Sequence, residues 1–137
     1  MIKQQAEFDC VLVSIANATG KDYYEIFPEE FRRVVQEKKG CYSGEITQAF
    51  EYAGLTKDVD YKSLYVRHAD EAVVRSFLWK RKALIQAVSL NHEGSEHVMF
   101  WDGQELHDPS NKQVYKYLSS VYPTYVWIFN EVIIAGD

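Results

Sequence analysis

The apolar stretch at residues 11–16 constrains the fold of this chain more than any other feature. A helix with apolar side chains on every side is expected to be buried, so the rest of the chain has to cover it. Asp9 precedes the stretch and is suited to be the N-cap, because a carboxylate there accepts hydrogen bonds from the free amides of the first turn. Residues 17–20 end the helix at a glycine. The sequence therefore predicts a buried helix near the N-terminus.

Cys10 lies in the first turn of this helix. The positive end of the helix dipole favours the thiolate, which is the nucleophilic form of cysteine. A free cysteine is also a common small core residue, and the position alone does not separate the two roles. Cys41 precedes a helix expected from Ser43 onward, and we expect it to be packed in the loop before that helix.

Helical patterns fill most of the first half of the chain, and strand patterns fill the second half. We expect helices at residues 10–16, 28–39, 43–54 and 70–78, a helical turn at 21–27, and strands at 61–66, 83–90, 97–101, 104–107, 125–129 and 132–134. Residues 112–119 are expected to form a short helix or an irregular connection. This order is typical of the α+β class. With 137 residues and no linker or repeat, the chain is predicted to be a single domain over residues 1–137.

The composition excludes several classes of partner. The chain has 15 Lys and Arg against 20 Asp and Glu, a formal net charge of −5, and its only basic cluster is residues 80–82. Nucleic-acid binding requires a basic surface and is not expected. No segment approaches membrane-spanning length, and the N-terminus does not have the pattern of a signal peptide. We expect a cytoplasmic protein without membrane contact, in a compartment where a Cys10–Cys41 disulfide does not persist.

A superficial zinc pattern occurs at residues 92–97, which begin and end with histidine. The spacing from His92 to His97 is one residue longer than in helical zinc motifs, and Gly94 and Ser95 indicate a loop. Two cysteines are too few for a four-ligand site on their own. We therefore expect no metal ion and no cofactor.

The dipeptide formed by Asp102 and Gly103, between two apolar-rich runs, is a strong signal for a two-residue hairpin turn. A turn of that length places His97 directly opposite Asp108, and opposed residues share a face with Cβ atoms about 4.5–5.5 Å apart. His107 then points to the other face. A carboxylate beside an imidazole fixes its tautomer and stabilises its protonated form, as the third member of a nucleophilic triad does. A surface pair without function is the alternative.

Taken in order, these residues resemble a known family. Gln4 lies six positions before Cys10, Asp9 and Cys10 open a buried helix, and a late His97 is followed eleven residues on by Asp108 and Pro109. This pattern resembles the papain-like cysteine peptidases, and most closely the bacteriocin-processing peptidase domains of certain ABC exporters. Those domains are of similar size and have a helix like that at residues 43–54. The resemblance implies an α+β fold in which the N-terminal helix that carries the cysteine packs on a C-terminal antiparallel sheet.

The resemblance also implies a role for each matched residue. Cys10 would be the nucleophile, and His97 its general base and later general acid. Asp108 would orient His97. The side-chain amide of Gln4, with the backbone amide of Cys10, would form an oxyanion hole, in which each donor is worth about 3–4 kcal/mol. Gln5 is the neighbouring candidate for this role.

Two positions depart from the family pattern. Val11 follows the cysteine, where the exporter domains usually have glycine, and its β-branched side chain is expected to narrow the cleft. Glu96 places a negative charge beside His97 and is expected to raise the pKa of the imidazole.

The predicted function is that of a cysteine peptidase, which cleaves a peptide or protein substrate through a thioester intermediate. One alternative is another enzyme with the same triad, an amidase, deamidase, acyltransferase or peptidyl transferase, since fold and triad set only acyl-thioester chemistry. The other alternative is a catalytically inactive papain-like module that binds a peptide in the same cleft. Selective reactivity of Cys10 separates the enzymes from the binding module.

Overall fold

Four helices precede the first strand, a fifth helix follows it, and the remaining strands come after, so the class is α+β, as the sequence predicts. The computed structural model describes residues 1–88, 96–110, 113–116, 118 and 121–132. The helices are α1 (Cys10–Thr19), α2 (Tyr23–Ile26), α3 (Glu29–Glu37), α4 (Ser43–Tyr52) and α5 (Glu71–Phe77). The strands are β1 (Tyr61–Tyr65), β2 (Arg81–Val88), β3 (Glu96–Trp101), β4 (Leu106–His107), β5 (Val114–Tyr115) and β6 (Pro123–Val132).

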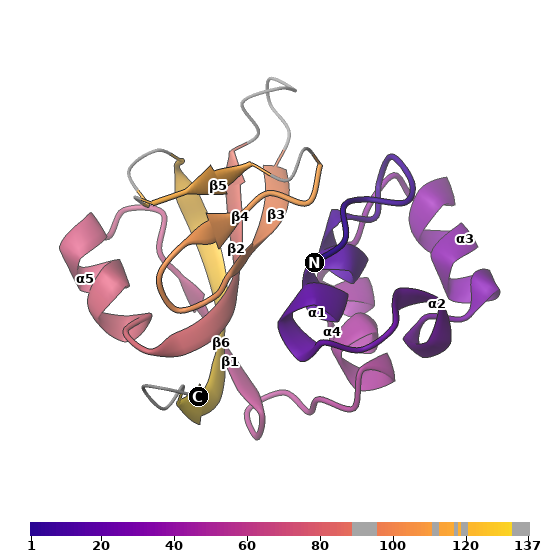
Figure 1. Cartoon of the computed structure of the whole chain (residues 1–137), viewed down its shortest axis with the longest axis horizontal. Helices are drawn as coiled ribbons and strands as arrows, with labels where there is room; N and C mark the ends of the chain where they lie inside the picture. Colours follow the sequence, from indigo (N-terminus) through magenta and orange to yellow (C-terminus); the bar gives the residue numbers. More distant parts are fainter. Residues whose placement is uncertain (89–95, 111–112, 117, 119–120, 133–137) are drawn as a thin grey trace.

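The strands form one sheet in the order β1-β6-β2-β3-β4-β5, with antiparallel pairing throughout (Figure 1). The long strand β6 lies between β1 and β2 and pairs with both. The sequence predicts two strands where β6 is a single strand, at residues 125–129 and 132–134, and residues 133–134 lie outside the described part. Of residues 112–119, expected to form a short helix or an irregular connection, residues 113–116 and 118 are described and include the short strand β5.

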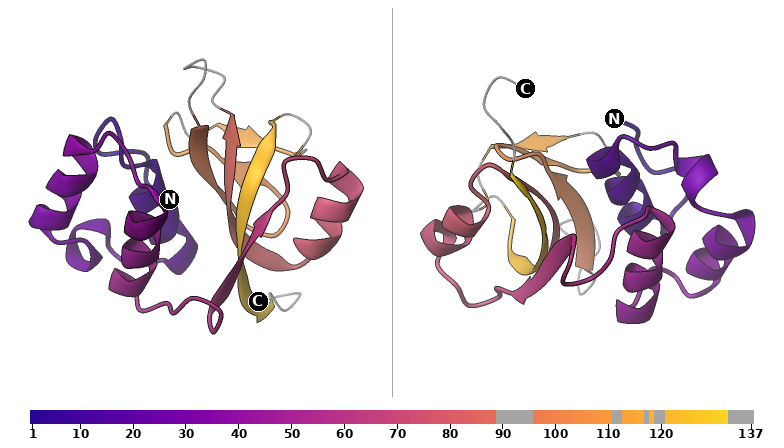
Figure 2. Two further views of the ribbon diagram at one scale, coloured as in Figure 1. Left: turned by 180° about the vertical axis from the view of Figure 1, so that it is seen from behind. Right: turned by 90° about the horizontal axis from the view of Figure 1, so that it is seen from below.

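The sheet separates two hydrophobic cores. Helices α1 to α4 lie on one side of the sheet and α5 on the other (Figures 1 and 2). The core on the α1 side includes Leu12, Val13 and Ile15, all with no exposed surface. The core on the α5 side includes Val74 and Leu78. The N-terminal helix is therefore buried against the sheet, because its side chains leave it no polar face. No helix within the described residues is long and apolar enough to cross a membrane.

The hairpin between β3 and β4 has a longer turn than the sequence predicts. Trp101 pairs with Leu106, whereas a two-residue turn would require Gln104 as its partner. The side chain of Asp102 explains the difference, because its Oδ1 accepts hydrogen bonds from the backbone amides of Gln104 and Glu105, both at 2.8 Å. An aspartate that folds back on the following amides stabilises its own turn. The predicted register is thus wrong by two residues.

A shift of two residues keeps every side chain on its predicted face, since the side-chain period of a strand is two. Continuing the observed register places Met99 opposite Asp108. His97 is then the diagonal neighbour of Asp108 on the same face, and diagonal neighbours are within reach of long side chains. His97 and Asp108 therefore still lie close together, although the register from which this was predicted is wrong.

Candidate active site

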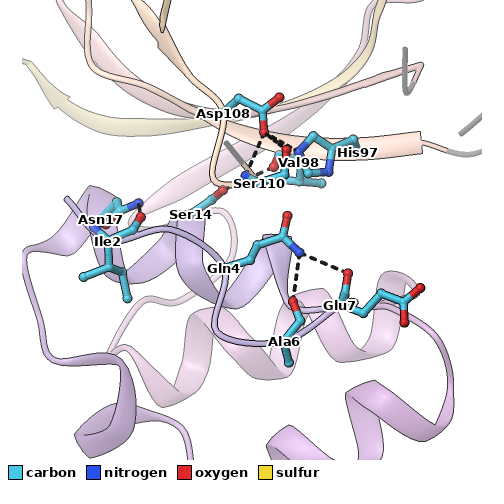
Figure 3. A network of polar contacts seen from close by, with 10 residues as sticks. All are labelled: Ile2, Gln4, Ala6, Glu7, Ser14, Asn17, His97, Val98, Asp108 and Ser110. Carbon is cyan, nitrogen blue, oxygen red and sulfur yellow. Dashed lines mark hydrogen bonds and ion pairs between the residues drawn. The ribbon is translucent and has the colours of Figure 1, made fainter. Parts of the chain in front are cut away.

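Cys10 is the first residue of α1, and its side chain is half-buried beside the core on the α1 side. The apolar sequence that follows buries the helix and holds its N-terminal end against β3. Ser14, one turn further along α1, donates a hydrogen bond from its Oγ to the carbonyl oxygen of Val98 on β3, at 3.3 Å. The elements that carry Cys10 and His97 are therefore linked directly by a buried hydrogen bond (Figure 3).

Asp9 occupies the N-cap position but does not cap the helix with its side chain. It is 1% exposed, and its Oδ2 accepts hydrogen bonds from the Tyr23 hydroxyl at 2.7 Å and the Gln5 amide at 3.1 Å. Burial and the hydrogen bond to Asp9 raise the pKa of Tyr23, so its hydroxyl keeps its proton. The predicted side-chain cap is wrong, because the carboxylate is held by these other donors. No side chain caps the first-turn amides beside Cys10.

His97 and Asp108 form a hydrogen-bonded pair. Nε2 of His97 lies 2.7 Å from Oδ1 of Asp108, and the two side chains are 18% and 7% exposed (Figure 3). The same oxygen accepts hydrogen bonds from the amide of Ser110 at 2.8 Å and from its hydroxyl at 2.7 Å. Burial tends to raise the pKa of Asp108, but the hydrogen bonds from His97 and Ser110 lower it. The carboxylate is therefore ionised when it meets the imidazole.

Ser110 was not predicted from the sequence. The available signal was its position two residues after Asp108, from which a backbone amide and a hydroxyl reach back to the carboxylate.

The charge state of His97 depends on both of its neighbours. Burial lowers the pKa of His97, but hydrogen bonds to Asp108 and to the thiol of Cys10 raise it to about 10. Because Nε2 faces Asp108, Nδ1 is the nitrogen left for Cys10. Asp108 and Cys10 raise this pKa, and Glu96, which the sequence suggests for that effect, is not among the causes. Glu96 instead accepts a hydrogen bond from Gln86.

Gln4 lies below the His97–Asp108 pair in Figure 3, with its side-chain nitrogen directed away from the pair. Nε2 donates to the carbonyl oxygens of Ala6 at 3.1 Å and Glu7 at 3.0 Å. Oε1 is buried and has no hydrogen-bond partner within the described part of the chain. A role as oxyanion donor stays a prediction, and it requires this amide to turn so that an N–H group faces the substrate.

The N-terminal segment ties the two halves of the molecule together. The backbone amide of Gln4 donates to the carbonyl oxygen of Pro109 at 2.7 Å, next to Asp108. Ile2 and Asn17 exchange two hydrogen bonds of 2.9 Å, which hold the start of the chain on α1. The segment thus runs from the helix that carries the thiol to the loop that carries the carboxylate.

A cleft of about 690 Å³ opens beside Cys10 and His97. It lies between the N-terminal end of α1, the loop and first turn of α4, and the sheet. The side chains that line it include Glu7, Phe8, Val11, Lys39, Cys41, Tyr42, Ile46, Lys57, Gln86, Glu96, Tyr125 and Trp127. Burial, with smaller effects of Cys10 and Glu45, raises the pKa of Cys41, so this second free thiol is held in its protonated form.

A second histidine–aspartate pair lies at the hairpin turn. Nε2 of His107 is 2.7 Å from Oδ2 of Asp102, and its ring stacks on that of Phe100 with centroids 5.8 Å apart. Neither His107 nor Asp102 lines the cleft. Among the described residues, no three His, Cys, Asp or Glu side chains are grouped as metal ligands, and residues 92–95 of the zinc-like pattern lie outside that part.

Comparisons with known proteins leave the family open. No protein-family model matches the chain, and no curated protein or solved structure matches it significantly. The function therefore has to be argued from the geometry of this site.

Proposed function

We propose that the protein is a cysteine peptidase with Cys10 as nucleophile. One observation carries the proposal: His97, hydrogen-bonded to Asp108, lines with Cys10 a cleft large enough for a peptide, and Cys10 is close enough to raise the pKa of His97. A nucleophile, a base in reach of it and a third group that orients the base are the signature of nucleophilic catalysis. The likeness to papain-like peptidases in residue order supports the same conclusion.

Acylation begins from an imidazolium at His97, whose pKa is raised to about 10, with the Cys10 proton already on Nδ1 and the sulfur present as thiolate. The thiolate attacks the carbonyl carbon of the scissile amide, and a tetrahedral intermediate forms. His97 then gives its proton to the leaving nitrogen, the C–N bond breaks, and the acyl group remains on sulfur as a thioester. The Asp108 carboxylate stabilises the imidazolium through Nε2 and orients the ring during both proton transfers.

The oxyanion of the intermediate needs hydrogen-bond donors close to Cys10. The backbone amide of Cys10 is suited to this role, since it lies at the positive end of α1, where no side chain provides a cap. Gln4 is the second donor in this proposal, after rotation of its side-chain amide away from Ala6 and Glu7.

Deacylation reverses the proton transfers. Neutral His97 takes a proton from a water molecule, whose oxygen attacks the thioester carbonyl carbon. The C–S bond breaks, the acid product leaves, and the thiolate of Cys10 remains beside the imidazolium of His97, as at the start. An amine in place of the water would give a transferase, so the same site permits the alternative acyl chemistry.

Alkylation by iodoacetamide near pH 7 tests the proposal. We expect Cys10 to react at least tenfold faster than Cys41, because His97 supports the thiolate of Cys10 whereas burial keeps Cys41 protonated. His97→Ala should abolish this preference. His107→Ala is the matched control, since it removes the histidine of the other pair, and should leave the preference intact.

Equal and slow labelling of both cysteines would contradict every catalytic role and favour a binding module. If Cys10 is labelled selectively, a peptide-library screen identifies the reaction. Peptide cleavage that requires Cys10 supports a peptidase, whereas products extended by an added amine, without cleavage in water alone, would replace it with a transferase.

A further inference from the structure

A row of side chains crosses the open end of the sheet on the face that lines the cleft. Tyr65 of β1 pairs with Tyr125 of β6, and Tyr125 pairs in turn with Gln86 of β2. Gln86 donates a hydrogen bond from Nε2 to the carboxylate of Glu96 on β3. Tyr65, Tyr125 and Gln86 share a face because they pair directly, and Glu96 shares it as the diagonal neighbour of Gln86, two residues from its direct partner Val98. The row therefore consists of two aromatic rings, an amide and a carboxylate.

This row is accessible, whereas the row beside it is not. Tyr65 and Tyr125 are 58% and 38% exposed, and Glu96 is exposed as well. Two residues further along β6, Trp127 is only 8% exposed under the helices, and its ring stacks on that of Tyr125 with centroids 5.8 Å apart. The aromatic surface therefore continues from the core on the α1 side out to the open end of the cleft.

The chemistry of this row suits a cation. A carboxylate attracts an ammonium or guanidinium group through charge, and a tyrosine ring on the same face of the sheet attracts it through cation–π interaction. No lysine or arginine among the described residues forms an ion pair with Glu96. The hydrogen bond from Gln86 fixes the position of the carboxylate, which reduces the ordering that a ligand has to supply.

The other charged side chains that line the cleft influence the position of a positively charged group. Lys39 and Lys57 line the cleft from the segments before α4 and before β1, and Glu7 lines it from the segment before α1. A positive side chain is repelled by the two lysines and attracted to the carboxylates of Glu96 and Glu7. The net charge of −5 also favours the approach of basic peptides at low ionic strength.

We propose that the cleft selects peptides with an arginine or lysine side chain close to the bond that is cut, and that Glu96 and Tyr125 bind this side chain. The selection rests on the proposed function, because Glu96 lines the same cleft as Cys10 and His97, so that a side chain held at Glu96 shares this cleft with the reacting centre. Gln86 is a positioning residue for the carboxylate.

The test separates binding from cleavage. Acetylated and amidated octapeptides, each with arginine at one position, are compared with matched peptides in which citrulline replaces arginine. Affinity is measured by calorimetry on the Cys10→Ala variant, which binds without turnover. We expect at least one arginine peptide to bind about tenfold more tightly than its citrulline counterpart, and Glu96→Gln to remove most of this difference.

Two further variants keep the result interpretable. Tyr125→Leu, which removes the ring but not the charge, should weaken the arginine peptide about threefold. Glu51→Gln removes a carboxylate of α4 outside the cleft and should change nothing. Each variant is compared with the parent by circular dichroism, so that a loss of fold is recognised.

The outcomes distinguish the two proposals. Equal affinity for arginine and citrulline peptides, no binding of any library member, or discrimination that survives Glu96→Gln overturns the basic subsite, even if the intact protein cleaves peptides. A second outcome is that the protein prefers arginine over citrulline peptides through Glu96 but the intact protein cleaves none of them. This result overturns the proposed peptidase activity, and the basic subsite then belongs to a peptide-binding module.

Discussion

Among the described residues, two histidine–aspartate pairs have the same separation of 2.7 Å, and the other neighbour of each histidine distinguishes them. Cys10 raises the pKa of His97 and lines the same cleft, whereas the ring of His107 stacks on Phe100. The first pair is therefore placed for proton transfer, and the second stabilises a turn. A histidine–aspartate pair therefore indicates a catalytic role only where a nucleophilic side chain lies beside the histidine.

The His97–Asp108 pair also makes stability depend on pH. The pKa of His97 is raised from its ordinary value of 6.5 to about 10 in the folded protein. The charged imidazole therefore stabilises the fold fully below about pH 6.5, and this contribution is lost as the pH rises to about 10. The pKa of Asp108 is lowered, so its contribution is present above its ordinary value of 3.8 and is lost as the pH falls through the lowered folded value.

Replacing Asp108 by asparagine tests its role at the residue scale. Asp108→Asn removes the charge that holds the proton on His97, so burial dominates and the pKa of His97 falls by at least one unit, as measured by NMR titration of the imidazole proton signals. The rate of Cys10-dependent turnover should fall by 10²-fold or more with the fold intact. The control is Asp102→Asn, which removes the carboxylate of the other pair; a comparable fall in the His97 pKa there would contradict the assignment.

At the scale of elements, the sequence predicts the type of most helices and strands but not the turn that sets the hairpin register. The apolar residues of α1 and the alternation in the strands are read directly from the chain, because burial imposes those patterns. The four-residue turn depends on a side chain of Asp102 that bonds its own backbone, an effect that competes with the short turn expected for the dipeptide. Likewise, Asp9 has the residue type of a cap, but Tyr23 and Gln5 bind its carboxylate through tertiary contacts that no local pattern reveals.

In the candidate site, too, periodic patterns predict some features and irregular segments leave others unpredicted. Helix position predicts Cys10 at the start of α1, and strand periodicity keeps His97 and Asp108 on one face even when the register is off by two. The orientation of the Gln4 amide was not predictable, since it depends on the path of a loop with no periodicity.

The hydrogen bond between α1 and β3 is expected to set the distance between nucleophile and base. Ser14→Ala removes the donor to Val98 and should lower the free energy of unfolding by about 1 kcal/mol, as measured by urea denaturation. The alkylation rate of Cys10 should fall as well, because the helix then shifts relative to His97. Thr19→Val is the control: its hydroxyl donates to the carbonyls of Ile15 and Ala16 within α1 and accepts from the amide of Lys21 just after the helix, and none of these partners is on the sheet. An equal loss of Cys10 reactivity in both variants would show that the bond to β3 has no special role.

At the scale of the whole molecule, the nucleophile and its base come from opposite halves. Cys10 belongs to the helical half and the His97–Asp108 pair to the sheet, so catalysis in the proposed mechanism requires the halves to keep a fixed relation (Figure 2). Apolar contacts between α1 and the sheet hold the helical half and the sheet together. The N-terminal segment adds a polar link, through Gln4 and Pro109, beside the triad.

This link provides the last prediction. Asn17→Ala removes both hydrogen bonds to Ile2 and frees the start of the segment, so the Gln4 amide should open more often from Pro109. We expect its hydrogen exchange to accelerate about fivefold, which corresponds to a loss of about 1 kcal/mol of local stability. Asn130→Ala is the matched control, because Asn130 holds a different loop through Val59 and should leave the Gln4 amide unchanged. Unaltered exchange in Asn17→Ala would mean that the Gln4–Pro109 contact holds by itself, and that packing of α1 alone fixes the two halves of the site.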